Sequence, residues 1–277
     1  MVLPLTNGVS ALGELAKAIR QSVVRSLARA GSGHLGGSMS SADILTTLYF
    51  SVMRHDPANP SWTGRDRFIL SIGHIAPVLY ATLAEAGYFP KDELLSLRKM
   101  GSRLQGHPGR DHGLPGLELS AGSLGQGLSV ATGMAIAAKM DRLDSRIYCL
   151  CGDGELQEGS VWEAAMAAAH HQLNNLVAVI DRNGVQIDGS TETVMGLEPL
   201  KKKWEAFGWD TLECDGHDFR SLMSSFQKTN VEQTRPSVII AKTKMGKGIK
   251  SIEGDYRWHG KAPSMEQAEA FILEIAR

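Results

Sequence analysis

Two short apolar runs on either side of an Ala-rich stretch constrain the fold of this chain most strongly. Residues 147–151 (IYCLC) and 176–180 (LVAVI) are typical of buried strands, and residues 158–173 between them have the composition and length of a helix. Two parallel strands need a crossover connection of about a dozen residues or more, so this order predicts a βαβ unit. The chain is therefore expected to contain a parallel sheet.

A polar residue follows each of these two strands. Asp153 lies in a Gly-Asp-Gly turn after the first strand, and Asn183 comes shortly after the second. Both are expected at the carboxyl ends of neighbouring strands, where open α/β sheets bind ligands. Carboxylate and amide oxygens suit Mg²⁺ or Ca²⁺ rather than zinc, and Gly152 and Gly154 let the backbone approach an anion closely. The pattern indicates a divalent metal that is held on a diphosphate.

The composition excludes several classes of protein. The 277 residues carry 29 Lys and Arg against 30 Asp and Glu, a formal charge of −1 that favours neither a nucleic-acid nor a membrane partner. The 3 cysteines lack the spacing of a zinc site and are too few for a disulfide framework. The first residues have no basic region or long apolar stretch, so we expect a cytoplasmic protein without a signal peptide or membrane span.

The remaining elements follow from hydrophobic periodicity and turn residues. Residues 11–30 are predicted to form an amphipathic helix, and Ser41 or Asp43 could cap a second helix. Residues 1–277, without a repeat or linker, are expected to form one doubly wound α/β domain, a mostly parallel sheet with helices on both faces. The other expected elements are strands at 67–71, 210–213 and 237–241, helices at 78–86, 128–140, 201–207, 219–229 and from about 264, and irregular stretches at 101–120 and 184–199.

Four of the nine histidines lie in loops that are rich in glycine or flanked by proline: His34, His74, His107 and His259. A single loop histidine is more often a surface residue, but four in such settings suggest a shared role. Imidazole can donate or accept a hydrogen bond and can move a proton near neutral pH, which suits a substrate with many hydroxyl and carbonyl groups. Residue spacing alone does not show that the four converge.

A lone Gly-Asp-Gly triplet is as often only a tight turn. Residues 152–189 (GDGELQEGSVWEAAMAAAHHQLNNLVAVIDRNGVQIDG), however, resemble the thiamine diphosphate motif of transketolases along their whole length. The four histidine loops are similar too, so the resemblance runs from about Ala11 to Gly260. The family's amide ligand lies in its Asp-x-Asn run, which implies that Asn183 binds the metal and that Asn175 only belongs to a helix-ending turn.

The resemblance implies a role for each matching residue at the cofactor. Asp153, Asn183 and the carbonyl of Val185 would bind Mg²⁺ or Ca²⁺, and the amide of Gly154 would donate to the diphosphate of thiamine diphosphate. His74 and His259 would also hold the diphosphate. The family's Gly-Pro-Leu turn, which meets the aminopyrimidine ring, is matched by Gly122, Ser123 and Leu124. Ser123 replaces the frequent proline and makes this turn less stiff.

Four residues would act in catalysis. His34 and His107 would contact the reacting hydroxyl and carbonyl of the sugar, and His259 would lie near the reacting carbon. Glu158 matches the acid that reaches across the subunit contact towards the partner's catalytic glutamate, and so belongs to both the catalytic and the cofactor-binding set. An acidic residue is also favoured near a helix N-terminus for purely structural reasons.

The resemblance implies transfer of a two-carbon ketol unit from a ketose phosphate to an aldose phosphate. In this family the activating glutamate lies in a pyrimidine-binding domain, which is absent here. We therefore expect the N-terminal subunit of a split transketolase, which pairs with a C-terminal subunit in a heterotetramer. The alternatives are a subunit similar to deoxyxylulose-phosphate synthase, a transketolase for a specialised sugar or sulfo-sugar, and a non-catalytic diphosphate-binding module. Dinucleotide and P-loop signatures are not matched.

Overall fold

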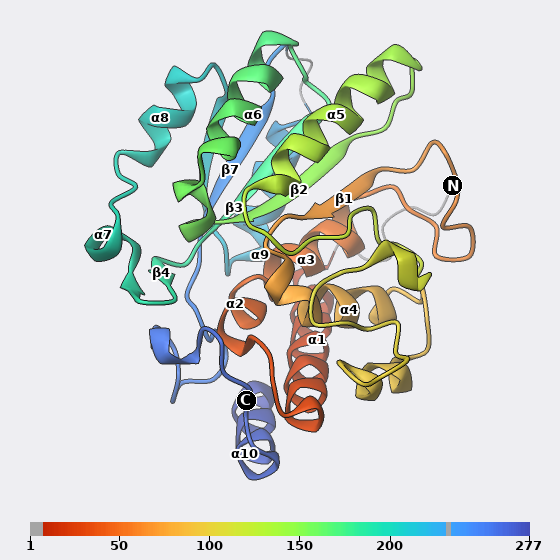
Figure 1. The fold of residues 1–277 in the computed structure, drawn as a ribbon, viewed down its shortest axis with the longest axis vertical. Helices are drawn as coiled ribbons and strands as arrows, with labels where there is room; N and C mark the ends of the chain where they lie inside the picture. Colours follow the sequence, from red (N-terminus) through yellow and green to blue (C-terminus); the bar gives the residue numbers. More distant parts are fainter. Residues whose placement is uncertain (1–7, 231–233) are drawn as a thin grey trace.

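The computed structural model describes residues 8–230 and 234–277. Its centre is a sheet of five parallel strands in the order β1-β2-β3-β7-β6 (Figure 1). All five strands run in the same direction, so their carboxyl ends meet at one edge of the sheet. The strands are β1 (Arg67–Leu70), β2 (Ile147–Gly152), β3 (Leu176–Arg182), β6 (Asp210–Asp215) and β7 (Ser237–Lys242).

Helices cover both faces of the sheet and create two separate cores. Alternate residues of β1, β2, β3 and β7 point into opposite cores: Tyr148 and Leu150 of β2 belong to the first, and Cys149 and Cys151 to the second. This arrangement confirms the predicted doubly wound fold. The first core contains α1 (Val9–Ala30), α3 (Ala42–Thr47), α4 (Ala76–Glu85), α9 (Phe219–Lys228) and α10 (Met265–Ala276), and the second contains α5 (Gln126–Met140), α6 (Gly159–His170) and α8 (Leu200–Ala206).

The predicted strands and long helices are present, but the structure also contains short elements that were not expected. Short α2 (Leu35–Ser40) follows His34, and a π-type turn (Leu48–Val52) follows α3, where one longer helix was predicted. Neither Ser41 nor Asp43 caps a helix through its side chain. Residues 184–199 hold a hairpin of β4 (Val185–Gln186) and β5 (Gly189–Ser190), followed by α7 (Thr191–Val194). Such short elements are too brief to produce a periodic pattern.

Short 3₁₀ turns connect several of these elements and place functional candidates at strand ends. One turn, Gly154–Gln157, separates β2 from α6, so Glu158 is the residue immediately before α6 and does not lie in its first turn as predicted; its side chain makes no capping hydrogen bond. None of the described helices is long and apolar enough to cross a membrane. The three cysteines are buried and free. The other 3₁₀ turns are Gly73–Ile75, Lys91–Ser96, Arg110–His112 and Tyr256–Trp258.

Candidate active site at the carboxyl edge of the sheet

A cavity of about 500 Å³ lies at the carboxyl ends of the central strands. It brings together segments from most of the chain, including all four histidine loops and the turns after β2 and β3. Most of the predicted site residues line its wall. These are His34, His74, His107, Leu124, Asp153, Gly154, Glu158, Asn183, Val185 and His259, whereas Gly122 and Ser123 lie exposed outside the wall.

Three of the histidines form a compact cluster. The ring centroids of His34 and His74 are 4.8 Å apart, those of His74 and His259 are 5.1 Å apart, and those of His34 and His259 are 5.7 Å apart. His34 precedes α2, His74 lies in the 3₁₀ turn after β1, and His259 follows the turn Tyr256–Trp258. His107 lines the same cavity. The fold thus supplies the convergence that residue spacing could not show.

Burial favours the neutral form of these histidines. Burial, and then the nearby His259, lower the pKa of His34 to about 4 and that of His74 to about 3. Burial also lowers the pKa of His107 and of His259. A neutral imidazole offers one donor and one acceptor. The Nδ1 of His34 is buried and has no hydrogen-bond partner among the described residues.

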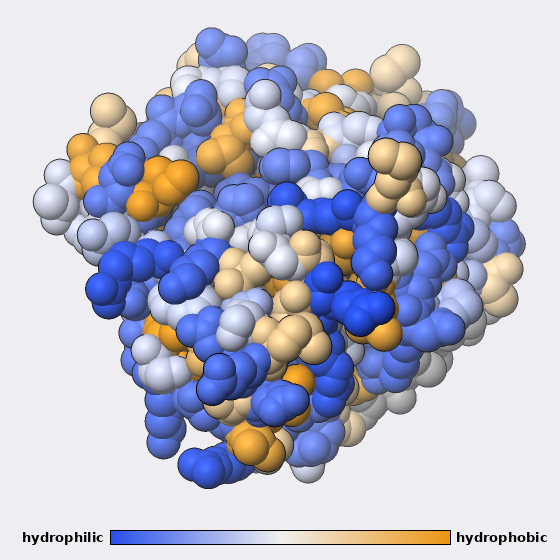
Figure 2. All heavy atoms as spheres, turned by 60° about the horizontal axis from the view of Figure 1, so that its bottom comes forward, coloured by the Kyte–Doolittle hydropathy of each residue, from blue (hydrophilic) through white to orange (hydrophobic). Residues whose placement is uncertain are grey.

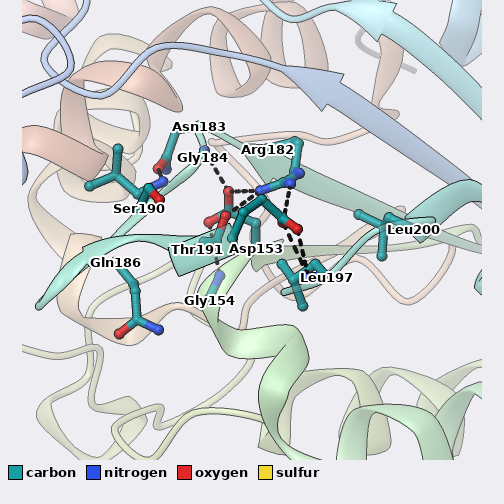
Figure 3. A network of polar contacts seen from close by, with 12 residues as sticks. Asp153, Gly154, Arg182, Asn183, Gly184, Gln186, Ser190, Thr191, Leu197 and Leu200 are labelled. Atoms are coloured by element: carbon teal, nitrogen blue, oxygen red, sulfur yellow. Dashed lines mark hydrogen bonds and ion pairs between the residues drawn. The ribbon is translucent and has the colours of Figure 1, made fainter. Parts of the chain in front are cut away.

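Asp153 is the only acid of the predicted metal site and is almost fully buried. Its Oδ1 accepts from the amide of Gly154 at 2.8 Å, and its Oδ2 accepts from the amide of Gly184 at 2.6 Å and from Nη1 of Arg182 at 3.0 Å (Figure 3). Burial and the nearby Asp181 nevertheless raise the pKa of Asp153 to about 6. A carboxylate that is this difficult to ionise is well placed to gain from a bound cation.

Asp181 fixes the second predicted ligand. It is buried and accepts from Ser40 Oγ at 2.5 Å, from Ser41 Oγ at 2.8 Å and from Asn183 Nδ2 at 3.3 Å. Because the NH₂ group of Asn183 faces Asp181, its Oδ1 is left to face Val185, whose amide it accepts at 3.0 Å.

The oxygens near this edge fit a hard divalent cation. Asp153, Asn183 and the carbonyl of Val185 would supply a carboxylate, an amide and a peptide oxygen, a donor set that suits Mg²⁺ or Ca²⁺. The described ranges contain no group of three or more His, Cys, Asp or Glu that could hold a metal through side chains of those types alone. Asn175 precedes β3 at the opposite edge of the sheet, where its side chain donates to the carbonyl of Ala135.

Some polar residues of the cavity wall were not predicted from the sequence, among them Glu155, Asp181 and Gln186. Asp181 belongs to the same Asp-x-Asn run as Asn183, so its position at a strand end was a signal that could have been used. Gln186 lies against the Gly-Asp-Gly turn, where a Cβ on Gly154 would stand 3.1 Å from the Cβ of Gln186. The glycine therefore keeps the backbone of this turn open to a ligand.

Comparison with known proteins agrees with this geometry. The family model described as transketolase, thiamine diphosphate binding domain, matches residues 12–271. The chain is 44% identical over 257 residues to an apulose-4-phosphate transketolase subunit of Phocaeicola vulgatus, and the match covers 93% of this chain and 91% of that protein. It is 42% identical to the 6-deoxy-6-sulfo-D-fructose transketolase subunit SqwG of a Clostridium species, with 95% of each chain covered.

Solved transketolases share the fold but are longer. The transketolase from Leishmania mexicana superimposes with a TM-score of 0.90 at 32% identity, over 96% of this chain and 41% of that one. The transketolase from Campylobacter jejuni gives a TM-score of 0.87 at 32% identity, over 97% of this chain and 46% of that one. The chain thus spans less than half the length of these single-chain proteins.

Proposed function

The chain belongs to the transketolase family, as its thiamine diphosphate-binding domain, and from this premise we propose that it is the N-terminal subunit of a split transketolase. The support comes from its relatives. Those named as transketolase subunits are covered over 91% to 98% of their own length, whereas the single-chain transketolase of the mouse is covered over 43%. In this proposal a separate subunit carries the pyrimidine-binding domain, and two copies of each chain form a heterotetramer.

The cavity has the groups that thiamine diphosphate and a divalent metal need. Asp153, Asn183 and the carbonyl of Val185 would hold the metal, and the amide of Gly154 and the ring of His74 would hold the diphosphate. When bound, thiamine diphosphate supplies an electron sink that lets a carbon–carbon bond beside a carbonyl break. Asp153 is buried and the other four residues are half-buried, so hydrogen bonds from them to a ligand compete with less water than at an exposed surface.

The neutral histidines fit the sugar. The proposed reaction moves a two-carbon ketol unit from a ketose phosphate to an aldose phosphate, so protons must move at a hydroxyl and at a carbonyl oxygen. A neutral ring can accept a proton from a hydroxyl at one nitrogen and donate one from the other nitrogen. His34, His107 and His259 all line the cavity and are the candidates for these two proton transfers.

The partner subunit is proposed to cover the side of the cavity that α5 and α6 present. Glu158 at the start of α6 is exposed, and so are small or polar residues along one face of α5: Gln126, Ser129, Gly133 and Ala137. Small side chains allow a second chain to pack closely. An obligate contact of this kind is expected to bury more than about 2,000 Å².

Apolar side chains beside the cavity add to this surface. In Figure 2 apolar residues gather at the left, on the side of the molecule where Figure 1 shows α7. Large apolar side chains that are exposed in this region are Ile187, Val194 and Met195, with 62%, 44% and 60% of their surface accessible. Ile187 also lines the cavity, so the apolar patch and the site are continuous.

For the substrates we propose a chemical class and no single sugar. The donor is a ketose that carries an anionic group, because the relatives are named for apulose 4-phosphate and for a sulfofructose. A sulfonate and a phosphate are both tetrahedral anions, so a specialised sulfo-sugar is the second candidate. The groups that would distinguish the two are proposed to lie on the partner subunit.

The test is reconstitution. The chain alone is expected to show no ketol transfer with xylulose 5-phosphate and ribose 5-phosphate, and a mixture with a pyrimidine-domain subunit, supplied with thiamine diphosphate and Mg²⁺, is expected to be active. Steady turnover by the chain alone would refute the split arrangement. If the mixture assembles but is inactive with these sugars, activity with apulose 4-phosphate or a sulfofructose would identify the substrate class.

A further inference from the structure

The buried carboxylate of Glu155 joins three separate segments of the site. Glu155 is 1% exposed and lies in the 3₁₀ turn that follows Asp153. Its Oε1 accepts from the amide of Gly125 at 2.7 Å and from the hydroxyl of Ser71, and its Oε2 accepts from the amide of Gly152 at 3.0 Å. A carboxylate is costly to bury unless hydrogen bonds replace its water, and here three donors do so.

These donors hold the Gly-rich turn before α5 from both sides. While the amide of Gly125 donates to Glu155, its carbonyl accepts from Ser160 Oγ at 3.0 Å. Two residues later, the amide of Gly127 donates to Ser71 Oγ at 3.0 Å. Ser71 thus connects the end of β1 both to Glu155 and to the first turn of α5.

The turn is also packed too tightly to accept larger residues. Gly125 has a φ of +82°, and a Cβ there would lie 2.6 Å from Ser160 Oγ and 2.8 Å from the Cβ of Glu158. A Cβ on Gly127 would collide with Ser71. The turn therefore has one position relative to the strand ends, and hydrogen bonds to Glu155 and to the two serines define that position.

We propose that Glu155 is a positioning residue that holds the turn of residues 122–127 against the ends of β1 and β2, so that Leu124 keeps its place in the cavity wall. This inference rests on the proposed function, because it assigns Leu124 to the ring end of thiamine diphosphate. The turn contributes Leu124 to the cavity and contains none of the predicted metal ligands. Its backbone lacks the proline that would stiffen position 123, so its rigidity depends on the hydrogen bonds to Glu155, Ser71 and Ser160.

Three variants distinguish a positioning role of Glu155 from a general contribution to the stability of the fold. Glu155→Gln has nearly the same shape but replaces one acceptor by an NH₂ group, which must face either the Gly152 amide or the Gly125 amide and the Ser71 hydroxyl together. Ser71→Ala keeps the charge of Glu155 and removes the hydroxyl that joins it to Gly127. Glu269→Gln makes the same chemical change at an exposed position of α10 and is the matched control.

The first measurement is amide hydrogen exchange of the peptide that spans residues 122–128 in the cofactor-free chain. Since a hydrogen bond to a charged group contributes about 1.5 to 3 kcal/mol, Glu155→Gln is expected to speed exchange of the Gly125 amide at least about tenfold. Ser71→Ala is expected to speed exchange at Gly127, and Glu269→Gln to change neither. Unchanged exchange in Glu155→Gln and Ser71→Ala would overturn the proposal.

The second measurement compares two ligands by calorimetry in the presence of Mg²⁺, with the chain paired with a pyrimidine-domain subunit. Ser71→Ala is expected to weaken binding of thiamine diphosphate about tenfold and to leave inorganic diphosphate within about twofold, because only the thiamine meets the turn. Equal losses for both ligands would mean that the hydrogen bonds of Glu155 and Ser71 stabilise the whole site, and this result would overturn the positioning role. If the chain reconstituted with a pyrimidine-domain subunit binds inorganic diphosphate but not thiamine diphosphate, the proposed function fails, and the exchange measurement alone decides whether Glu155 holds the turn.

Discussion

Arg182 donates to the carboxylate of Asp153 across 3.0 Å, although the two residues lie on different strand ends. The same guanidinium also contacts Thr191 (Figure 3), and it forms ion pairs with Glu192 and Glu198. One oxygen of Asp153 is thus occupied by Arg182 and Gly184, while the other accepts only the amide of Gly154 among the described residues. The second oxygen is the one that a metal ion can reach with least rearrangement.

Replacing Asp153 should abolish binding of thiamine diphosphate in the presence of Mg²⁺. The carboxylate is the only anionic oxygen in the predicted ligand set, so Asp153→Ala is expected to lower the affinity by at least about a hundredfold. Calorimetry with and without a chelator measures this effect. Unchanged affinity in Asp153→Ala would rule out the proposed metal site.

Two asparagines provide a matched comparison. Asn183→Ala is expected to weaken metal-dependent binding about tenfold or more, because it removes an oxygen ligand that Asp181 orients. Asn175→Ala, at the opposite edge of the sheet, is expected to leave this binding within about twofold. The reverse order of effects would show that the metal is not bound at the end of β3.

The cofactor-free chain should lose stability as the pH falls from about 6.5 to about 4. In the folded chain His34 and His74 have pKa values of about 4 and about 3, below the ordinary value of 6.5, so in this window the unfolded chain binds protons that the folded chain does not. Asp153 acts in the opposite direction, since its pKa of about 6 lies above the ordinary 3.8. Because two histidines lower the free energy of unfolding on acidification and only one aspartate raises it, the net effect is a loss of stability.

The measurement is urea unfolding at several pH values in the presence of chelator. His74→Gln cannot take up the proton and is expected to flatten the dependence, whereas Asp153→Asn is expected to steepen it. A stability that rises on acidification, or that His74→Gln leaves unaltered, would contradict the assignment of neutral buried histidines.

Replacing Glu158 should reduce the activity of the reconstituted enzyme but leave the stability of the isolated chain unchanged. Glu158→Gln is expected to leave the unfolding temperature of the isolated chain within about 2 °C, because the side chain is exposed. In the reconstituted enzyme it is expected to reduce kcat about tenfold or more, since the resemblance assigns it to the contact with the partner's catalytic glutamate. Full activity of the assembled variant would leave Glu158 with only the structural role of an acid at the start of α6.

The long elements could be predicted from the sequence because their signals are local. Apolar runs gave β2 and β3, and helical spacing gave α1 and α5, within a few residues. The hairpin of β4 and β5 could not be found in this way, because Gly184 and Gly189, with φ values of +77° and +151°, turn the chain within a few residues. The role of Glu155 is also hidden, because its donors come from residues up to 84 positions away.

The register in which β2 pairs with β3 sets the distance between the two predicted metal ligands. Gly152 stands opposite Asp181, and the residues of both strands before this pair are committed to one core or the other. A slip by one residue would exchange the side chains of the two cores and disrupt the packing of both. Apolar side chains that never touch a ligand therefore set the separation of Asp153 and Asn183, and the surrounding loops are free to diverge towards new sugars without disturbing it.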